Sequence, residues 1–206
     1  MYALVESESI TKLFPYPKGF VLNGVQYSQD IFYKWTKAEK EAIGIYEVET
    51  DSTNYKDKKW YINTNESFTF ANNKVTKSWG TATAKAHADS LYTEQDKIDG
   101  KIPEGKDVGD VAVEGLKTVL IRNIKSQAAG ILQNTDWYVI RKADAGTAVP
   151  SSITTYRAAV RTKCTEMETT ITNAVDTPAL ETLYTYTKQE DGSITRPLGE
   201  FPRLEV

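Results

Sequence analysis

"ILQNTDWYVIRKADAG", residues 131–146, interrupts an apolar helical pattern with the polar run Asn-Thr-Asp and then continues into four large apolar residues. On either side of this stretch, side chains recur at three- and four-residue steps, which places each set on one face of a helix. The stretch therefore predicts an αα-hairpin with a structured elbow. The first set is Val113, Leu116, Leu120, Ile124, Gln127 or Ala128, and Ile131, and the second is Ile153, Tyr156, Val160, Cys164 or Met167, and Ile171.

The elbow itself carries signals for both helix ends. Asn134 or Thr135 is expected to end the first helix, and Asp136 to accept backbone N–H bonds at the turn. Pro150, with Ser151 or Ser152, is typical of a helix start. We expect Trp137 and Val139 to fold back onto the helix pair and Tyr156 to pack into the hairpin. The elbow aromatics would then add core to two helices that bury little by themselves.

The first half of the chain has a different character. Fifteen of the 22 aromatic residues lie before residue 80, which favours a β-rich N-terminal part followed by a helical C-terminal part, an α+β fold. Asn23-Gly24 predicts a tight hairpin. Thr36 and Glu39 form the pattern of a capping box for a short helix that Gly44 can close. The expected strands are 2–5, 10–13, the pieces flanking 23–24, 45–49, 60–63, 67–70 and 74–80, with a turn at 72–73.

The composition predicts where the chain divides. Residues 81–98 are rich in Ala and polar side chains and predict a weakly amphipathic helix, while residues 99–110 hold three Gly and one Pro and are the preferred boundary. We therefore expect a β-rich domain at 1–80, a helix and linker at 81–109, a helical hairpin domain at 110–187 and an extended tail at 188–206. Pro178 favours a short helix start, and Asp191-Gly192 a turn.

The bulk properties exclude several classes of partner. A net charge of −3 and a pI near 5.4 give no electrostatic footprint for nucleic acid. No apolar run is long enough to span a bilayer, and the N-terminus lacks the pattern of a secretory signal, so we expect synthesis in a cytoplasm. The single cysteine, Cys164, excludes an internal disulfide.

The residues do not predict an enzyme, a metal site or a cofactor. His87 is the only histidine and Cys164 lies on an expected buried stripe, so a solvated His and a structural Cys are favoured over a catalytic pair. Zinc, calcium and phosphate-binding spacings are not found. Glu47, Glu49 and Asp51 share one face of a strand, as glycosidase carboxylates could, but a solvated strand face is favoured.

The N-terminal aromatics leave two interpretations open. They can form a small β core, or part of them can form an exposed platform for a sugar or a partner protein. Trp60 and Tyr61 are adjacent on an expected strand, so at least one of the two would face outward or cross an interface. A carbohydrate- or receptor-binding tip that uses these aromatics is thus an alternative function.

The elbow and its flanks resemble a known family. Thr135-Asp136-Trp137, a loop with Pro150, and a helix with Tyr156, Arg157 and Arg161 resemble the C-terminal helical segment of tailed-bacteriophage tail proteins, which include tail-fibre assembly and tail-assembly chaperones. Residues 42–49, which follow a short expected helix containing Trp35, are similar to the N-terminal β part of such proteins. The resemblance covers about a third of the chain, and the middle region and the Pro-containing tail depart from it.

The resemblance implies a binding protein that acts in the host cytoplasm during assembly, in the virion tail, or in both. The expected partner is a tail-fibre or baseplate protein, and a homo-oligomer is compatible with the pattern. Arg157 and Arg161 lie four residues apart and could meet a carboxylate together, or be solvated, or pair with Glu168 or Asp144. The residues expected to bind the partner are Trp137, Tyr138, Tyr156, Arg157, Arg161, Trp60 and Tyr61.

Overall fold

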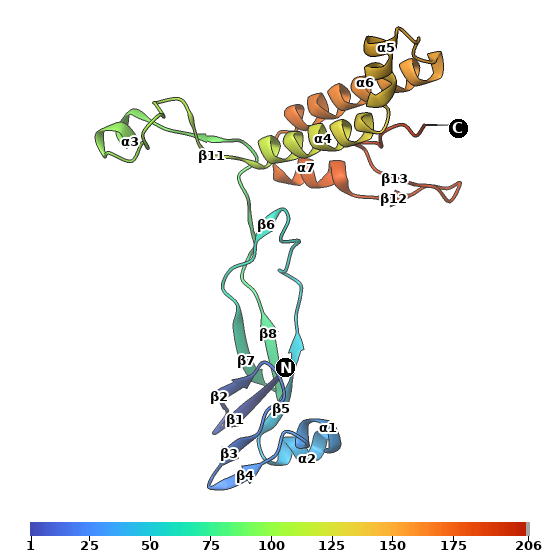
Figure 1. Cartoon of the computed structure of the whole chain (residues 1–206). Coiled ribbons are helices and arrows are strands. Elements are labelled where there is room, and N and C mark those ends of the chain that lie inside the picture. The colour runs from blue at the N-terminus through green and yellow to red at the C-terminus, as the bar shows by residue number, and fades with distance from the viewer. Residues whose placement is uncertain (205–206) are drawn as a thin grey trace. The chain divides into compact units, whose positions relative to one another are not determined.

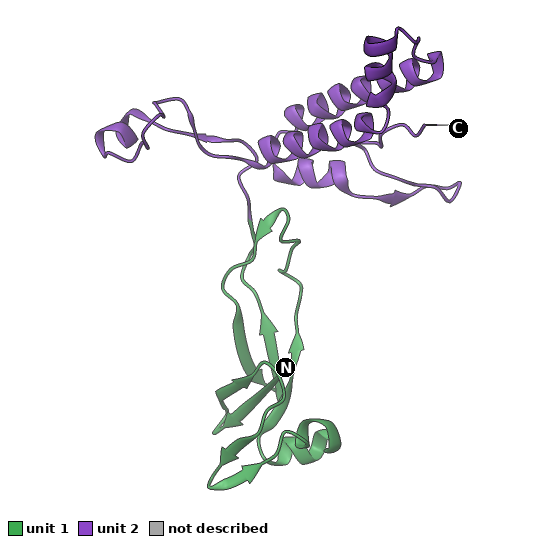
Figure 2. Cartoon of the chain, viewed as in Figure 1, with its two compact units in different colours: residues 1–83 green, residues 84–206 purple. Residues whose placement is uncertain are grey.

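The protein is α+β and is built as two compact units (Figure 2). The structure, a computed structural model, describes residues 1–204. Unit 1 is Met1–Thr83 and holds most of the strands, and unit 2 is Ala84–Val206 and holds the long helices. The division follows Thr83, three residues beyond the expected end of the β-rich domain, and residues 99–110 lie within unit 2 rather than at its edge.

Unit 1 is organised around a five-stranded sheet of order β2-β1-β5-β8-β7 (Figure 1). Neighbouring strands are antiparallel except β5 and β8, which are parallel. The bounds of the elements are β1 Tyr2–Glu6, β2 Ser9–Phe14, β3 Phe20–Leu22, β4 Val25–Tyr27, α1 Ile31–Lys34, α2 Lys37–Ala42, β5 Ile45–Thr50, β6 Tyr61–Ile62, β7 Ser67–Ala71 and β8 Lys74–Ser78, with β9 Thr83–Ala84 at the boundary.

Alternate residues of β1 point to opposite sides of this sheet, and an apolar cluster lies on each side. Leu4 packs with Phe14, Phe20 and Phe32 in a cluster that the β3–β4 hairpin and α1 complete. Ala3 and Val5, which lie two residues apart and on the side of β1 opposite Leu4, form a second cluster with Val75, Tyr46 and Phe70. The N-terminal aromatics therefore serve mainly as core, which is the first of the two interpretations left open above.

The local signals of unit 1 are confirmed. Asn23 and Gly24 have φ values of 49° and 79°, as a tight two-residue hairpin requires. Thr36 accepts a hydrogen bond from the backbone N–H of Glu39, whose carboxylate accepts one from the Thr36 N–H. The expected turn at residues 72–73 joins β7 to β8, and both asparagines have positive φ.

Unit 2 is a helical layer with an extension before it and a short hairpin after it. Figure 1 shows α4 and α6 lying side by side, with α5 at one end of the pair. The bounds are β10 Ser90–Leu91, α3 Glu94–Ile98, β11 Val111–Val113, α4 Leu116–Gln133, α5 Asp136–Ala145, α6 Ser151–Asn173, α7 Thr177–Tyr184, β12 Thr187–Lys188 and β13 Ile194–Thr195.

The pair α4–α6 has the antiparallel arrangement that the periodicity predicts. Near the start of α4, the Lys117 ammonium donates to the carbonyl oxygen of Thr172 at 2.8 Å, and near its end the Leu132 carbonyl accepts from Arg157. The buried residues of the two helices are Leu120, Ile124 and Ala128 on α4, and Ile153, Arg157, Val160, Cys164, Met167 and Ile171 on α6.

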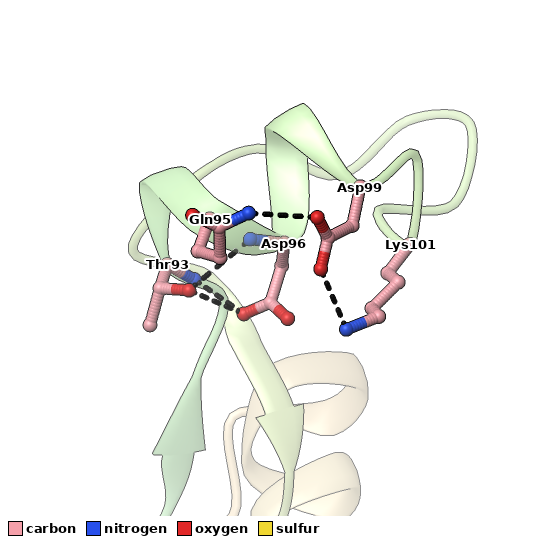
Figure 3. Close-up of polar contacts among 5 residues, drawn as sticks. All are labelled: Thr93, Gln95, Asp96, Asp99 and Lys101. Carbon is pink, nitrogen blue, oxygen red and sulfur yellow. Dashed lines mark hydrogen bonds and ion pairs between the residues drawn. The ribbon is translucent and has the colours of Figure 1, made fainter.

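The helix expected over residues 81–98 is wrong, because only α3, Glu94–Ile98, is helical there. Residues 86–91 use their backbone elsewhere: the Ala86 and His87 carbonyls accept from Leu116 and Lys117, and β10 pairs with β11. Residues 84–115 thus form an arm of unit 2 whose two ends meet at the start of α4. Figure 3 shows its short helix, where Thr93 and Asp96 cap each other and Asp99 bonds to Lys101 and Gln95.

The arm also caps α4. Gly115 precedes the helix and has no side chain to offer, so the Asp89 carboxylate accepts hydrogen bonds from the Gly115 N–H at 2.7 Å and the Thr118 hydroxyl at 2.8 Å. These two hydrogen bonds, the backbone one first, hold the pKa of Asp89 below its usual range. A carboxylate here also meets the positive end of the helix dipole.

The C-terminal segment is more structured than an extended tail. Pro178 opens α7, as expected, and the turn at Asp191-Gly192 joins β12 to β13. Leu198 is only 2% exposed, and its N–H donates to the Leu183 carbonyl at 3.1 Å. A buried leucine with a paired amide anchors the segment that follows the hairpin.

Two glycines of unit 1 allow the cost of a left-handed backbone to be compared with the cost of a steric clash. Gly44 and Gly24 both have φ near 80°, but only at Gly44 would a Cβ meet another atom, the Val5 carbonyl oxygen at 2.5 Å. We expect Gly24→Ala to cost about 1 kcal/mol for the left-handed backbone and Gly44→Ala about 3 kcal/mol, since β1 must also move. Hydrogen exchange of the β1 and β5 amides measures this, and equal effects of the two changes would contradict it.

The cap at Asp89 predicts a pH dependence. Because the folded-state pKa is depressed, the stabilisation is present above the unfolded-state pKa, about 3.9, and is lost as the pH falls through the folded value. Asp89→Asn should therefore lower the thermal stability of unit 2 at pH 7, and the difference from the wild type should shrink below about pH 4. Asp144→Asn, an exposed change on α5, is the control. A pH-independent difference would contradict the carboxylate cap.

Candidate partner-binding surface

An arginine lies in the apolar seam between α4 and α6. The buried positions of α6 are spaced by four, three, four, three and four residues, as in a heptad pattern, and Arg157 is the second of them. The sequence prediction placed Tyr156 on this stripe, but Tyr156 is only half-buried. Arg157 is 9% exposed, so its charge must be compensated inside the protein.

Three groups at the α4–α5 connection provide that compensation. One terminal nitrogen of Arg157 donates to the Leu132 carbonyl at 2.8 Å and to the Thr135 hydroxyl oxygen at 2.6 Å. The other forms an ion pair of 2.8 Å with the Asp136 carboxylate. Thr135 is itself buried and donates its hydroxyl proton to the Leu132 carbonyl. One guanidinium thus binds the end of α4 and the start of α5 to α6.

The elbow is therefore closed by polar contacts, and the expectation of an aromatic closure is wrong. Asn134 ends α4 as predicted, but Asp136 begins a ten-residue helix instead of a turn. Trp137 and Val139, expected to fold onto the helix pair, are 50% and 44% exposed. The physical reason is that Thr135, Asp136 and Arg157 already fill and satisfy the junction, which leaves the side chains of α5 facing solvent.

The outward face of α5 joins apolar and cationic groups. Trp137, Ile140 and Arg141 are three and four residues apart, so they share a face, and Ile140 is 66% exposed. The Arg141 guanidinium lies over the Trp137 ring at 4.5 Å and the Tyr138 ring at 5.5 Å, and these two rings are 4.1 Å apart. We call Trp137, Tyr138, Ile140 and Arg141 the α5 surface.

The other expected binding residues are placed differently. Arg161 is exposed, and within residues 1–204 its guanidinium makes one long hydrogen bond, 3.5 Å, to the Arg157 carbonyl. The Arg157 guanidinium is bound inside the elbow, so the two side chains do not converge on one carboxylate. In unit 1, Trp60 and Tyr61 are 3% and 5% exposed, which leaves little of either ring for a sugar or a partner. The Asp57 carbonyl accepts the backbone N–H groups of both residues, at 3.0 and 2.9 Å.

The groups considered for catalysis are held in structural contacts or are solvated. Cys164 is buried, as predicted, and desolvation, with a hydrogen bond to Glu168, raises the pKa of its thiol. Glu49 is exposed and pairs with Lys74 at 2.7 Å, and Glu47 is exposed beside it. Residues 1–204 contain no group of three or more side chains arranged to hold a metal ion.

The buried role of Arg157 could nevertheless have been inferred from the sequence. An Arg at a seam position of α6, opposite a Thr-Asp pair at a helix end, indicates a buried guanidinium with a prepared acceptor set. The face of α5 was harder to find, because a run of four large apolar residues is equally typical of core.

Replacing Arg157 should loosen the elbow. Arg157→Met keeps the unbranched apolar stem but removes the guanidinium, which leaves the Leu132 carbonyl and the Thr135 hydroxyl with fewer donors, so we expect a loss of about 2 kcal/mol. Asp136 is half-exposed, which moderates the ion-pair part. Arg161→Met, one turn further on an exposed position, should change stability by less than about 0.5 kcal/mol. Hydrogen exchange at the end of α4 and in α5 distinguishes the two, and similar protection in both variants would contradict the role of Arg157.

Comparison with known proteins adds no relative. No family model, no curated protein and no solved structure matches the chain. No helix within residues 1–204 is long and apolar enough to cross a membrane. The function is therefore proposed from the residues of this chain and their geometry.

Proposed function

We propose that this protein is a non-enzymatic, bacteriophage tail-associated protein that binds a tail-fibre or baseplate component. The observation that carries the binding role is the α5 surface, where Trp137 and Ile140 stay half or more exposed beside Arg141. Aromatic and arginine side chains are the residues that most often dominate the binding energy of protein interfaces. The phage assignment rests on the resemblance of residues 135–161 described above.

The rigidity of the elbow supports this proposal. Arg157 holds α5 to both long helices through Leu132, Thr135 and Asp136, so the α5 surface is ordered before a partner arrives. Pre-ordering reduces the entropy that binding must remove from loops and side chains. A surface that is both apolar and rigid is suited to a defined protein partner.

Two roles fit the same surface. A chaperone binds the fibre during assembly and leaves, whereas a minor virion component stays in the particle. Mass spectrometry of purified virions and of infected-cell lysate, from the phage that encodes the chain, separates them. Stoichiometric presence of the protein in virions supports the structural role, and its presence in the lysate alone supports the chaperone. If the protein co-purifies with a tail component in neither sample, the proposal is contradicted.

Substitutions on α5 should remove the partner without unfolding the protein. Trp137→Ala with Ile140→Ser is expected to reduce recovery of the tail component at least about tenfold, since central apolar contacts contribute about 2 kcal/mol or more. Val175→Ser is the matched control, because Val175 is 78% exposed in the same unit but lies outside α5. Thermal unfolding checks that all variants remain folded. Equal recovery with the double variant and with the control would contradict binding through α5.

A further inference from the structure

We propose that the α5 surface recognises a protein segment that places an Asp or Glu carboxylate against Arg141 and an apolar side chain against Trp137 and Ile140. This inference rests on the proposed binding function and adds the chemistry of the partner. It starts from the state of the Arg141 guanidinium in the free protein.

Arg141 is charged and is not neutralised within the part of the chain that the structure describes. It makes neither a hydrogen bond nor an ion pair there, and its Nε atom is buried without an acceptor. Its contacts are with the faces of Trp137 and Tyr138, which orient the guanidinium but accept no N–H hydrogen bond in the plane of the group. Only Nε is buried in this way, so the terminal nitrogens, which have no acceptor either, remain accessible donors for a partner's carboxylate.

The charges around Arg141 favour an anionic partner. Asp136, at the start of α5, is already paired with Arg157. Lys142 is exposed next to Arg141, and Asp144 is the one carboxylate further along the helix, exposed and outside ion-pair distance of Arg141. With Asp136 neutralised, the remaining formal charge of α5 is two cations against one anion, or +1. Charge complementarity therefore favours a carboxylate on the partner.

The apolar part of the surface selects the class of partner. Ile140 is aliphatic and mostly exposed, and Trp137 contributes a half-exposed ring on the same face. A planar guanidinium donates two parallel hydrogen bonds to a carboxylate, and its stacking on aromatic rings fixes the direction in which those N–H groups point. An acidic side chain followed or preceded by an apolar one matches both parts at once, as in an amphipathic helix or strand of another protein.

The inference can be tested without knowing the natural partner. A library of random 12-residue peptides would be selected against the full-length protein, and then against Trp137→Ala, Arg141→Gln, Arg141→Lys and Arg141→Glu. Thermal unfolding of each variant establishes that it is folded. For the wild type we expect peptides in which Asp or Glu lies within a few residues of an aromatic or large aliphatic residue.

Each variant is expected to change peptide binding in a different way. The selected peptides should bind Arg141→Gln about tenfold more weakly, bind Arg141→Lys with their acidic preference retained, and fail to bind Trp137→Ala. Arg141→Glu should select Lys or Arg in place of the acid. Asp144→Asn should strengthen binding of the acidic peptides, because it removes a carboxylate of α5 that repels the carboxylate of the peptide.

The recovered peptides distinguish a failure of this inference from a failure of the proposed function. Peptides that depend on Trp137 but carry no acidic residue, or that bind Arg141→Gln as well as the wild type, would overturn the carboxylate and leave the α5 surface as a binding site. Recovery of no peptide that depends on Trp137 would overturn the surface itself, and both proposals with it.

Discussion

The helical unit depends on one buried cation. Arg157 lies in the seam between α4 and α6, where the buried positions before and after it on α6 are apolar. Its partners are a carbonyl, a hydroxyl and a carboxylate, all from the five residues 132–136. Such a contact specifies geometry more than it adds stability, because a buried ion pair repays its desolvation only when every partner is in place. Here it determines that α5 turns outward at Asp136. The exposure of Trp137 follows from that direction, so the candidate binding surface is a consequence of the polar elbow.

The elements whose residues carry their own local signal were predictable from the sequence. Asn23-Gly24, Thr36 with Glu39, and Pro178 each determine backbone conformation within a few residues, and the structure has the turn, the capped helix and the helix start at those places. The long helices followed from periodicity for the same reason, since each apolar stripe is complete within one segment. The α+β class then follows from where the aromatics and the stripes lie.

The features that could not be predicted depend on distant partners. Residues 84–91 have helix-compatible composition, yet their carbonyls and the Asp89 carboxylate bond to residues 115–118, more than 20 positions away. Trp137 was assigned to the core because hydrophobicity alone indicates burial, and the competing polar network that displaces it becomes visible only when Arg157 is placed beside Thr135. The candidate surface was thus named only in part: Trp137 and Tyr138 were expected to bind the partner, Ile140 and Arg141 were not named, and Arg157, expected to face the partner, lies buried behind the surface.

The arm at residues 84–115 closes at its base, where β10 pairs with β11 and Asp89 bonds to Gly115. Its far end holds Gly100, Gly105 and Gly109, all at positive φ with open space around them. Loop entropy grows only slowly with length, so extra residues at that end change the free energy of closing the base very little. The arm is therefore a natural point at which to insert a peptide tag or a fluorescent domain, since the insertion would leave the cap of α4 and both termini of the chain untouched.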